Sequence, residues 1–282
     1  MSLIANGVHK VNIKADLTRD DFGRIRKMVY DYCGINLHDG KQALVRGRLM
    51  KRLRMLQMQS FADYLDYVDS DSSNKEFLLL IDILTTNKTS FFRESSHFDF
   101  LRDEVIPKLG DGPVKWWSAG CSSGEEPITM AVTLLEELNM VRNPLVKLLA
   151  TDLSTEVLKV AKEGIYSEDK LEGMPKYMLH KYFRKQAGEK VLYRVQPNVQ
   201  KMITYGRLNL LGEWPMKGPF QIIMCRNVMI YFDKITQQNL VRRFYDMLEP
   251  GGYLFVGHSE SVTNKEIGFT TVQPAAYQKT GV

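Results

Sequence analysis

The chain has 282 residues, of which 44% are hydrophobic and 25% charged, enough apolar material to bury one large core or two smaller ones. Its formal net charge of +5 favours an acidic partner or substrate. No stretch approaches the roughly 20 apolar residues of a membrane-spanning helix, and the three cysteines form no CxxC pair. We therefore expect a cytoplasmic protein with reduced thiols and no metal site.

The amino-terminal part of the chain has the pattern of a small helical domain. Residues 1–15 show no clear period and are expected to form a flexible arm. Thr18 and Asp21 form a capping-box-like pair, and the apolar residues that follow have helical spacing up to Gly34, which predicts a first helix. Similar patterns predict helices over about 40–57, after Ser60, and over about 74–84. Residues 16–84 are thus predicted to form an all-helical domain.

Residues 85–94, TTNKTSFFRE, fit neither a helix face nor the alternation of a strand. Polar side chains crowd there beside the apolar pair Phe91 and Phe92. Such a stretch is typical of a loop that lines a site, here the linker between two domains.

From Val114 onward, apolar runs of strand length alternate with helical patterns. The runs VKWWSAG, VKLLATD, FQIIMCRN and GYLFVGHS predict the buried strands of a parallel sheet covered by helices on both faces. FTTVQPAAYQK is expected to add a closing antiparallel strand. Residues 166–205 are polar and basic with short alternating stretches, so we predict a small β insertion there within the domain 95–282.

The turn after the first of these strands has features of a cofactor site. Gly120 and Gly124 would let the backbone approach a ligand closely, and Glu125 and Glu126 open the following helix. These glutamates would repel a phosphate but suit a positively charged group, such as the amine or sulfonium of S-adenosylmethionine. The same residues also fit a plain turn whose glutamates complement the helix dipole.

Polar residues also follow the later strands. Asp152 ends the second strand, where an acid can accept both ribose hydroxyls of an adenosine. The alternative is a helix cap, although Ser154 is better placed for that role. Arg226 and Asn227 end a further strand and would face the same ligand, because ligands of such sheets lie beyond the carboxyl ends of the strands. Arg226 could instead pair with an acid.

Several long motifs in one order carry a family resemblance: TTNKTSFFRE, WSAGCSSGEEP, ATDLS, CRNVMIYFD and LEPGGYLFVGHSES. Over almost its whole length the chain resembles the chemotaxis receptor glutamate methyltransferases. The resemblance implies an N-terminal helical domain joined to a class I methyltransferase domain. That domain is Rossmann-like, with a mostly parallel seven-stranded sheet and a small antiparallel β subdomain. It also implies methylation of glutamates on bacterial chemoreceptors, with S-adenosylmethionine as donor and S-adenosylhomocysteine as product.

The resemblance also implies roles for individual residues. Arg93 and Tyr231 match residues that act near the transferred methyl group. Residues 128–129 depart from the family, which often has an aromatic residue and a serine there. The cofactor contacts expected from the glycine turn and from the family are Asn87, Thr89, Arg93, Gly120, Glu125, Asp152, Asn209, Leu210, Arg226 and Asn227.

Residues 41–54 carry six basic residues and no acid, usually the mark of a solvated helix face. With a receptor as substrate, the helix is expected to steer an acidic helical bundle, with Arg46, Lys51 and Arg54 as contacts. The β insertion is a candidate dock for a receptor tail through strand addition. We expect a monomer that is recruited to receptor arrays at the inner membrane, without membrane insertion and without nucleic acid.

A glutamate carboxylate is already ionised near neutral pH, so the reaction needs no general base and rests on positioning. Arg93 could clamp a carboxylate of either the substrate or the cofactor, and the sequence leaves this open. Three alternatives remain: methylation of another acidic protein, a cofactor-binding sensor, and a nucleic-acid methyltransferase. The last is disfavoured because residues 226–228 do not form the Pro-Pro-aromatic loop of base amino methylation.

Overall fold

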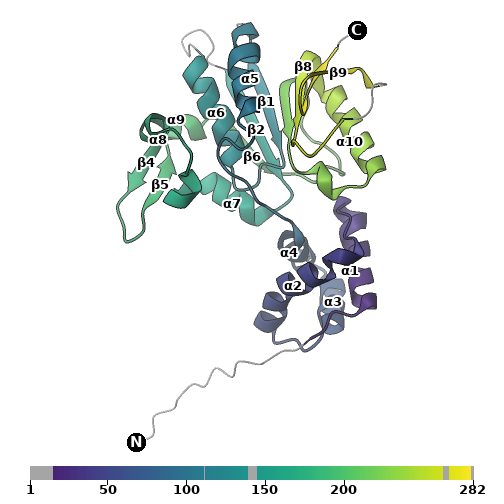
Figure 1. The fold of residues 1–282 in the computed structure, drawn as a ribbon. Coiled ribbons are helices and arrows are strands. Elements are labelled where there is room, and N and C mark those ends of the chain that lie inside the picture. Colours follow the sequence, from purple (N-terminus) through teal and green to yellow (C-terminus); the bar gives the residue numbers. More distant parts are fainter. Residues whose placement is uncertain (1–14, 111, 139–144, 263–266, 281–282) are drawn as a thin grey trace, which may run out of the picture. The chain divides into compact units, whose positions relative to one another are not determined.

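The structure is a computed structural model that describes residues 15–110, 112–138, 145–262 and 267–280. The chain divides into two compact units, Met1–Thr85 and Thr86–Val282 (Figure 1). Of the expected arm, only Ala15 lies within the described residues. Among the described residues, no helix has both the length and the apolar character to cross a membrane.

The first unit is entirely helical. Its elements are α1 (Arg19–Cys33), η1 (Asp39–Lys41), α2 (Gln42–Leu56), α3 (Phe61–Ser70) and α4 (Lys75–Leu84). At the start of α1 the Thr18 hydroxyl accepts from the backbone N–H of Asp21 at 3.1 Å, and the capping box is complete. Gly34 ends the helix in the left-handed region at φ 73°. The predicted start and end of this helix are therefore confirmed.

The second unit is built on a seven-stranded sheet. Its strands are β1 (Val114–Ala119), β2 (Val146–Asp152), β6 (Ile203–Arg207), β7 (Phe220–Cys225), β8 (Leu248–Val256), β9 (Phe269–Gln273) and β10 (Ala276–Lys279). They lie in the order β6-β2-β1-β7-β8-β10-β9. The pairs from β6 to β8 are parallel, whereas β10 is antiparallel to both β8 and β9. The predicted fold class is thus confirmed. The expected single closing strand is a hairpin of two.

Helices cover both faces of this sheet. They are α5 (Ser96–Phe100), η2 (Leu101–Val105), η3 (Ile106–Lys108), α6 (Glu125–Glu137), α7 (Thr155–Glu163), η5 (Met229–Tyr231) and α10 (Lys234–Met247). Successive residues of a strand point to opposite faces, so the neighbours Trp116 and Trp117 enter different cores. Trp116 packs in the core that includes Ile128 of α6, and Trp117 in the core that includes Phe244 of α10. Burial on both faces explains why β1, VKWWSA, does not alternate strictly between apolar and polar residues.

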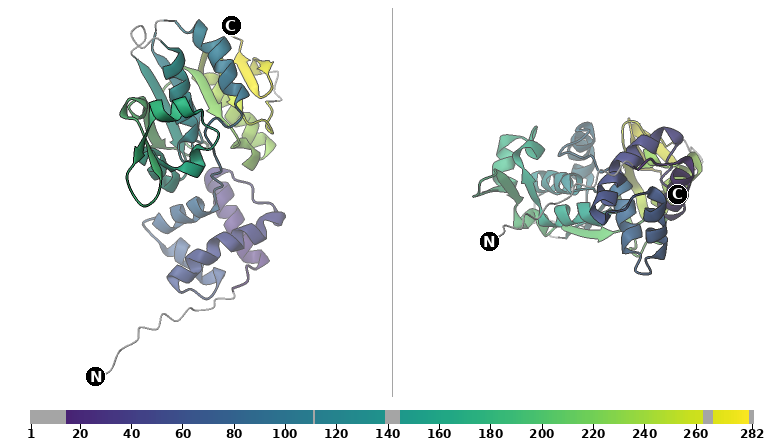
Figure 2. Two further views of the ribbon diagram at one scale, coloured as in Figure 1. Left: turned by 60° about the vertical axis from the view of Figure 1, so that its left-hand side comes forward. Right: turned by 90° about the horizontal axis from the view of Figure 1, so that it is seen from below.

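A small antiparallel sheet stands beside the main one in the larger unit (Figures 1 and 2). Its strands β3 (Ile165–Ser167), β5 (Leu192–Val195) and β4 (Phe183–Gln186) lie in that order, with β4 at an edge. The associated helices are η4 (Glu168–Leu171), α8 (Lys176–Tyr182) and α9 (Pro197–Gln200).

The predicted insertion, 166–205, was wrong at its carboxyl end. Ile203–Arg207 forms β6, which pairs with β2 in the main sheet. As the edge strand of that sheet, β6 is covered less completely than the central strands. Ile203 is buried and Thr204 exposed, so the sequence shows the same alternation as a small exposed sheet.

Candidate functional site

Several predicted site residues of the larger unit lie at or just after the carboxyl ends of β1, β2 and β7. Because these strands are parallel neighbours, their carboxyl ends meet at one edge of the sheet. Residues 86–95 reach this edge as well, since the Asn87 carbonyl accepts from the Ser122 hydroxyl at 3.0 Å. The sheet topology therefore brings these four separate segments together.

The turn after β1 depends on glycine. Gly120 has φ 93°, and a Cβ at this position would lie 2.4 Å from Cγ2 of Val228. Gly124 has φ 97° and also leaves no room for a side chain. The backbone N–H groups of Gly120 and Cys121 both donate to the Thr151 carbonyl, which ties the turn to β2. The turn is thus held against β2, and a close approach of the cofactor to the backbone of Gly120 stays a prediction.

Asp152 holds this turn from the neighbouring strand. Its Oδ2 accepts from the backbone N–H of Ser122 at 2.8 Å, and its Oδ1 accepts from that of Ser154 at 2.9 Å. Ser154 itself caps α7, as the sequence suggested. Each carboxylate oxygen can accept more than one hydrogen bond, so a contact of Asp152 with ribose stays a prediction.

Glu125 is a buried carboxylate with one oxygen that lacks a hydrogen bond. Its side chain is 0% exposed, and its Oε2 accepts from the Ser123 hydroxyl at 2.6 Å. Oε1 has no hydrogen-bond partner among the described residues, and only the Lys170 ammonium approaches it, at 3.5 Å. A buried carboxylate needs a cation or donors beside it, so Oε1 is suited to a ligand ammonium group.

The adjacent Glu126 has a different environment. Its Oε1 accepts from the Ser118 hydroxyl at 2.7 Å, and its Oε2 accepts from Nη1 of Arg226 at 3.2 Å. Burial raises the pKa of Glu126, although the Arg226 guanidinium opposes that shift. The two adjacent glutamates therefore differ. Both oxygens of Glu126 accept hydrogen bonds, whereas Oε1 of Glu125 has the Lys170 ammonium nearby but accepts no hydrogen bond from the described residues.

Arg226 lies buried between two acids. Its Nε and Nη2 donate to Oε2 of Glu94 at 3.3 and 3.0 Å, and Nη2 also donates to the Arg93 carbonyl. Together with the bond to Glu126, these contacts fasten residues 93–94 to the ends of β1 and β7. Pairing with acids, the alternative that the sequence left open, is what the structure shows. A cofactor contact of Arg226 stays a prediction.

Glu94 is a functional candidate that sequence reasoning passed over, although it ends the motif TTNKTSFFRE. Burial alone raises the pKa of Glu94, but the Arg226 guanidinium and N–H donors from His258 and Asn227 outweigh it. The pKa of Glu94 consequently lies below its usual range, and the carboxylate is ionised.

Glu260 was also missed, and it supports Asn227. The backbone N–H of Asn227 donates to Oε2 of Glu260 at 2.8 Å, and that of Ile230 donates to Oε1 at 3.0 Å. Asn227 has φ 59°, a left-handed conformation that few residues adopt. Burial raises the pKa of Glu260, and the backbone donors oppose that shift. The buried acid thereby fixes the strained backbone on which Asn227 and the η5 segment rest.

The two predicted catalytic residues are both partly exposed. Arg93 donates from Nη1 to the Lys88 carbonyl at 2.8 Å, within its own loop. Tyr231 is half-buried in η5, and its hydroxyl makes no hydrogen bond to the described residues. No hydrogen bond joins Arg93 to Tyr231 in the described part of the chain, so their joint action stays a prediction.

The remaining predicted cofactor residues lie in loops of the same unit. Thr89 is half-buried in the segment that precedes α5. The side-chain oxygen of Asn209 accepts from the Leu211 N–H at 3.0 Å. The Leu210 carbonyl accepts from the indole N–H of Trp214 at 3.1 Å. These bonds shape the loop after β6 and leave its contact with a ligand as a prediction.

The predicted receptor contacts lie on α2 of the helical unit. Arg46 donates to the Ala15 carbonyl and to Asp16, both at 3.2 Å, so part of its role is structural. Lys51 and Arg54 are exposed and form no ion pair with the described residues. Two of the three predicted contacts therefore remain available to a partner.

Two family models account for the two units. Residues 20–85 match the model described as CheR methyltransferase, all-alpha domain, and residues 87–277 match CheR methyltransferase, SAM binding domain. The chain belongs to the CheR methyltransferase family. The resemblance read from the sequence is thereby confirmed.

Relatives of the protein match it along most of their length. A chemotaxis protein methyltransferase of Borreliella burgdorferi is 41% identical over 281 residues, which are 96% of this chain and 98% of the relative. One from Escherichia coli is 41% identical over 251 residues, 88% of this chain and 87% of the relative. Chemotaxis protein methyltransferase 2 of Pseudomonas aeruginosa is 39% identical over 266 residues, 92% of this chain and 94% of the relative.

Family membership confirms S-adenosylmethionine as the cofactor and methyl transfer as the activity. The site fits this cofactor in two respects. The turn after β1 carries Gly120 and Gly124, both at positive φ, and Glu125 offers a buried carboxylate oxygen to an ammonium group. The site also lies at the carboxyl edge of a parallel sheet, where ligands of such folds bind.

Proposed function

We propose that the protein transfers the methyl group of S-adenosylmethionine to glutamate side chains of bacterial chemoreceptors, forming methyl esters during chemotactic adaptation. Relatives named chemotaxis protein methyltransferases support the receptor as substrate. The structural observation that supports the cofactor part of this proposal is Oε1 of Glu125, a buried oxygen beside the glycine turn that accepts no hydrogen bond from the described residues.

The bound cofactor supplies a methyl group made electrophilic by the sulfonium charge. The protein then has to hold an ionised glutamate in line with that methyl and exclude water, because a carboxylate needs no base to become a nucleophile. Arg93 is the residue we assign to orienting a carboxylate through its paired N–H groups, and Tyr231 to orienting the attacking oxygen.

The charge balance of the site suits an anionic acceptor. Glu94 and Glu126 share the Arg226 guanidinium, and burial favours the neutral form of Glu126. These acids therefore repel an incoming carboxylate less than two free charges would. Arg93 adds a half-exposed positive charge in the same segment.

Receptor binding is assigned to two surfaces. Lys51 and Arg54 of α2, which form no ion pair with the described residues, can steer an acidic helical bundle. Beside β4, at the edge of the small sheet, Phe183, Tyr193 and Leu179 help to line a hollow of about 640 Å³. An extended receptor tail could pair with this edge and place a side chain in the hollow.

The test is transfer of labelled methyl from S-adenosylmethionine to receptor-containing membranes, followed by alkali. Label on the receptor that alkali releases would identify a carboxyl methyl ester. Label on another acidic protein, or on nucleic acid, would refute the proposed acceptor. Cofactor binding without any transfer would instead indicate a sensor. Co-sedimentation with receptor arrays would test recruitment to the inner membrane, and light scattering would test the expected monomer.

A further inference from the structure

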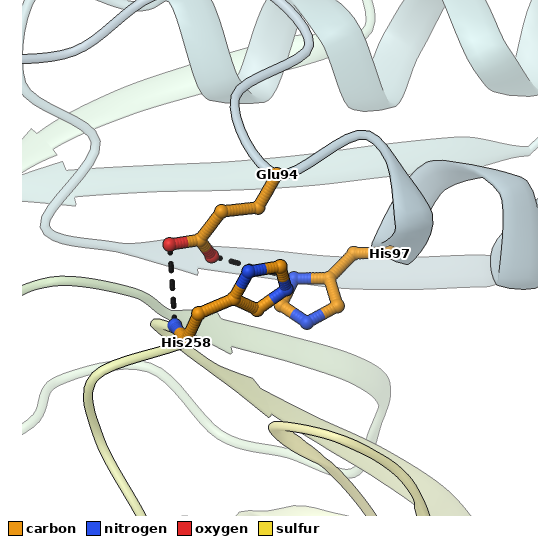
Figure 3. Close-up of side chains that lie close together, drawn as sticks. All are labelled: Glu94, His97 and His258. Atoms are coloured by element: carbon orange, nitrogen blue, oxygen red, sulfur yellow. Dashed lines mark hydrogen bonds and ion pairs between the residues drawn. The ribbon is translucent and has the colours of Figure 1, made fainter.

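Two histidines and a glutamate converge beside the Arg226 cluster. Glu94 precedes α5, His97 lies in α5, and His258 follows β8, 164 residues beyond Glu94 (Figure 3). Each residue offers one ligand atom, and these atoms all lie within 4.8 Å of one another. The three side chains thus bring two imidazoles and a carboxylate to one point of the larger unit.

His97 is the unusual member of this cluster. It is 0% exposed, and neither ring nitrogen has a hydrogen bond of ordinary geometry among the described residues. The backbone carbonyl of Pro274 lies near the ring but makes no hydrogen bond of ordinary geometry with it. A buried ring without partners is costly, which points to a further partner.

The geometry fits a shared ion. Nδ1 of His97 lies 3.8 Å from Oε2 of Glu94, and the rings of His97 and His258 have centroids 5.0 Å apart. Two imidazoles on one tetrahedral ion, with metal–nitrogen bonds of about 2.0–2.1 Å, also place their ring centroids roughly 5 Å apart. One nitrogen of His258 lies 3.4 Å from the Ser96 hydroxyl, which would orient the ring. The competing explanation is an edge-to-face ring contact without an ion.

Any ion at this point competes with Arg226. Oε2 of Glu94, the oxygen facing His97, also accepts from Nε and Nη2 of Arg226. A cation bound there would repel the guanidinium and weaken its hold on Glu94. Arg226 also fastens the Arg93 carbonyl and Glu126, so the loss would reach the segment that carries Arg93.

We propose that Glu94, His97 and His258 bind a divalent transition-metal ion of the zinc class, and that this binding inhibits methyl transfer by loosening Arg226. Imidazole ligands favour such ions, whereas magnesium and calcium prefer oxygen ligands. Water completes the coordination, since His258 is exposed and open to solvent.

Zinc binding to the whole protein, measured by calorimetry with magnesium as the contrasting ion, tests the site directly. His258→Gln removes an exposed ligand while keeping the backbone N–H that donates to Glu94. His38→Gln, in the helical unit, changes an exposed imidazole outside the cluster. We expect one zinc per chain in the native protein and in His38→Gln, at least about tenfold weaker binding in His258→Gln, and no magnesium binding. No zinc binding, or equal binding in all three proteins, would overturn the site.

Activity tests the inhibitory half separately. Methyl transfer by each protein, with zinc and with a chelator, should fall with zinc in the native protein and in His38→Gln but much less in His258→Gln. If zinc binds but does not slow methyl transfer, the proposed inhibition is refuted, whereas the proposed binding site is not. Because binding is measured without cofactor or receptor, its outcome does not depend on the proposed acceptor.

Discussion

Acid should destabilise the larger unit through His97, and His97→Gln should remove that effect. The pKa of His97 is lowered to about 4, chiefly by burial and also by the Arg226 charge, with Glu94 opposing and His258 adding to the decrease. In the unfolded chain the imidazole returns to its ordinary pKa of about 6.5. The unfolded state therefore binds a proton that the folded state rejects.

The sign follows from this difference. Stability is at its full value above about pH 6.5 and falls as the pH drops toward 4, because the unfolded chain takes up the proton first. Between about pH 7.5 and pH 5, a shift of this size removes about 2 kcal/mol of the free energy of unfolding. Glutamine cannot titrate, so the variant should lose about 2 kcal/mol less over the same range.

Urea unfolding followed by tryptophan fluorescence measures this quantity in the relevant unit. The three tryptophans, Trp116, Trp117 and Trp214, all lie in the unit Thr86–Val282, so the signal omits the helical unit. Glu94 and the other acids titrate in both proteins, so their contributions to the change in unfolding free energy largely cancel when the two proteins are compared. Equal acid sensitivity of the native protein and His97→Gln would refute the reasoning and show that His97 is hydrated or hydrogen-bonded in solution.

Four further outcomes are expected. Glu125→Gln should weaken S-adenosylmethionine binding about tenfold to a hundredfold by calorimetry, because a charged hydrogen bond of about 1.5–3 kcal/mol is lost; unchanged affinity would place the ammonium elsewhere. Lys170→Gln should tighten that binding by at most about fivefold, since its ammonium competes for Oε1 of Glu125 from a half-exposed position. Arg93→Lys and Tyr231→Phe should each lower kcat about tenfold in a methyl-transfer assay, and native turnover in both would remove their roles. Arg54→Glu should weaken receptor methylation, most at low salt, while cofactor affinity holds; loss of both would indicate unfolding.

The parts of the fold that could be predicted depend on neighbours in the sequence. The capping box of Thr18 and Asp21 spans three residues, so its geometry is visible in the sequence itself. The run around Trp116 and Trp117 does not alternate strictly between apolar and polar residues, because both sheet faces are covered. Ile203–Arg207 was misplaced because an edge strand is covered less completely and alternates like a strand of a small exposed sheet.

The cluster of Glu94, His97 and His258 could not be predicted from the sequence, because His258 is far from the other two in the chain. Metal sites are recognised in a sequence when the ligands recur at short spacing on one element, as in paired cysteines or histidines. Here 164 residues separate Glu94 from His258, and only the packing of α5 against the end of β8 joins them. Because no such local pattern occurs, the sequence led to a prediction of no metal, which the zinc-binding measurement tests.

Arg226 shows what position at a strand end can and cannot reveal. The topology correctly places it at the ligand edge of the sheet. Residues at that edge either contact the ligand or hold the loops that do, and both roles favour a charged side chain there. In this structure Arg226 holds a loop, because two of its N–H groups donate to Glu94, which lies 132 residues earlier in the chain. Since Arg226 also holds the Arg93 carbonyl and Glu126, its replacement should disturb the loop that carries Arg93 even without a lost cofactor contact.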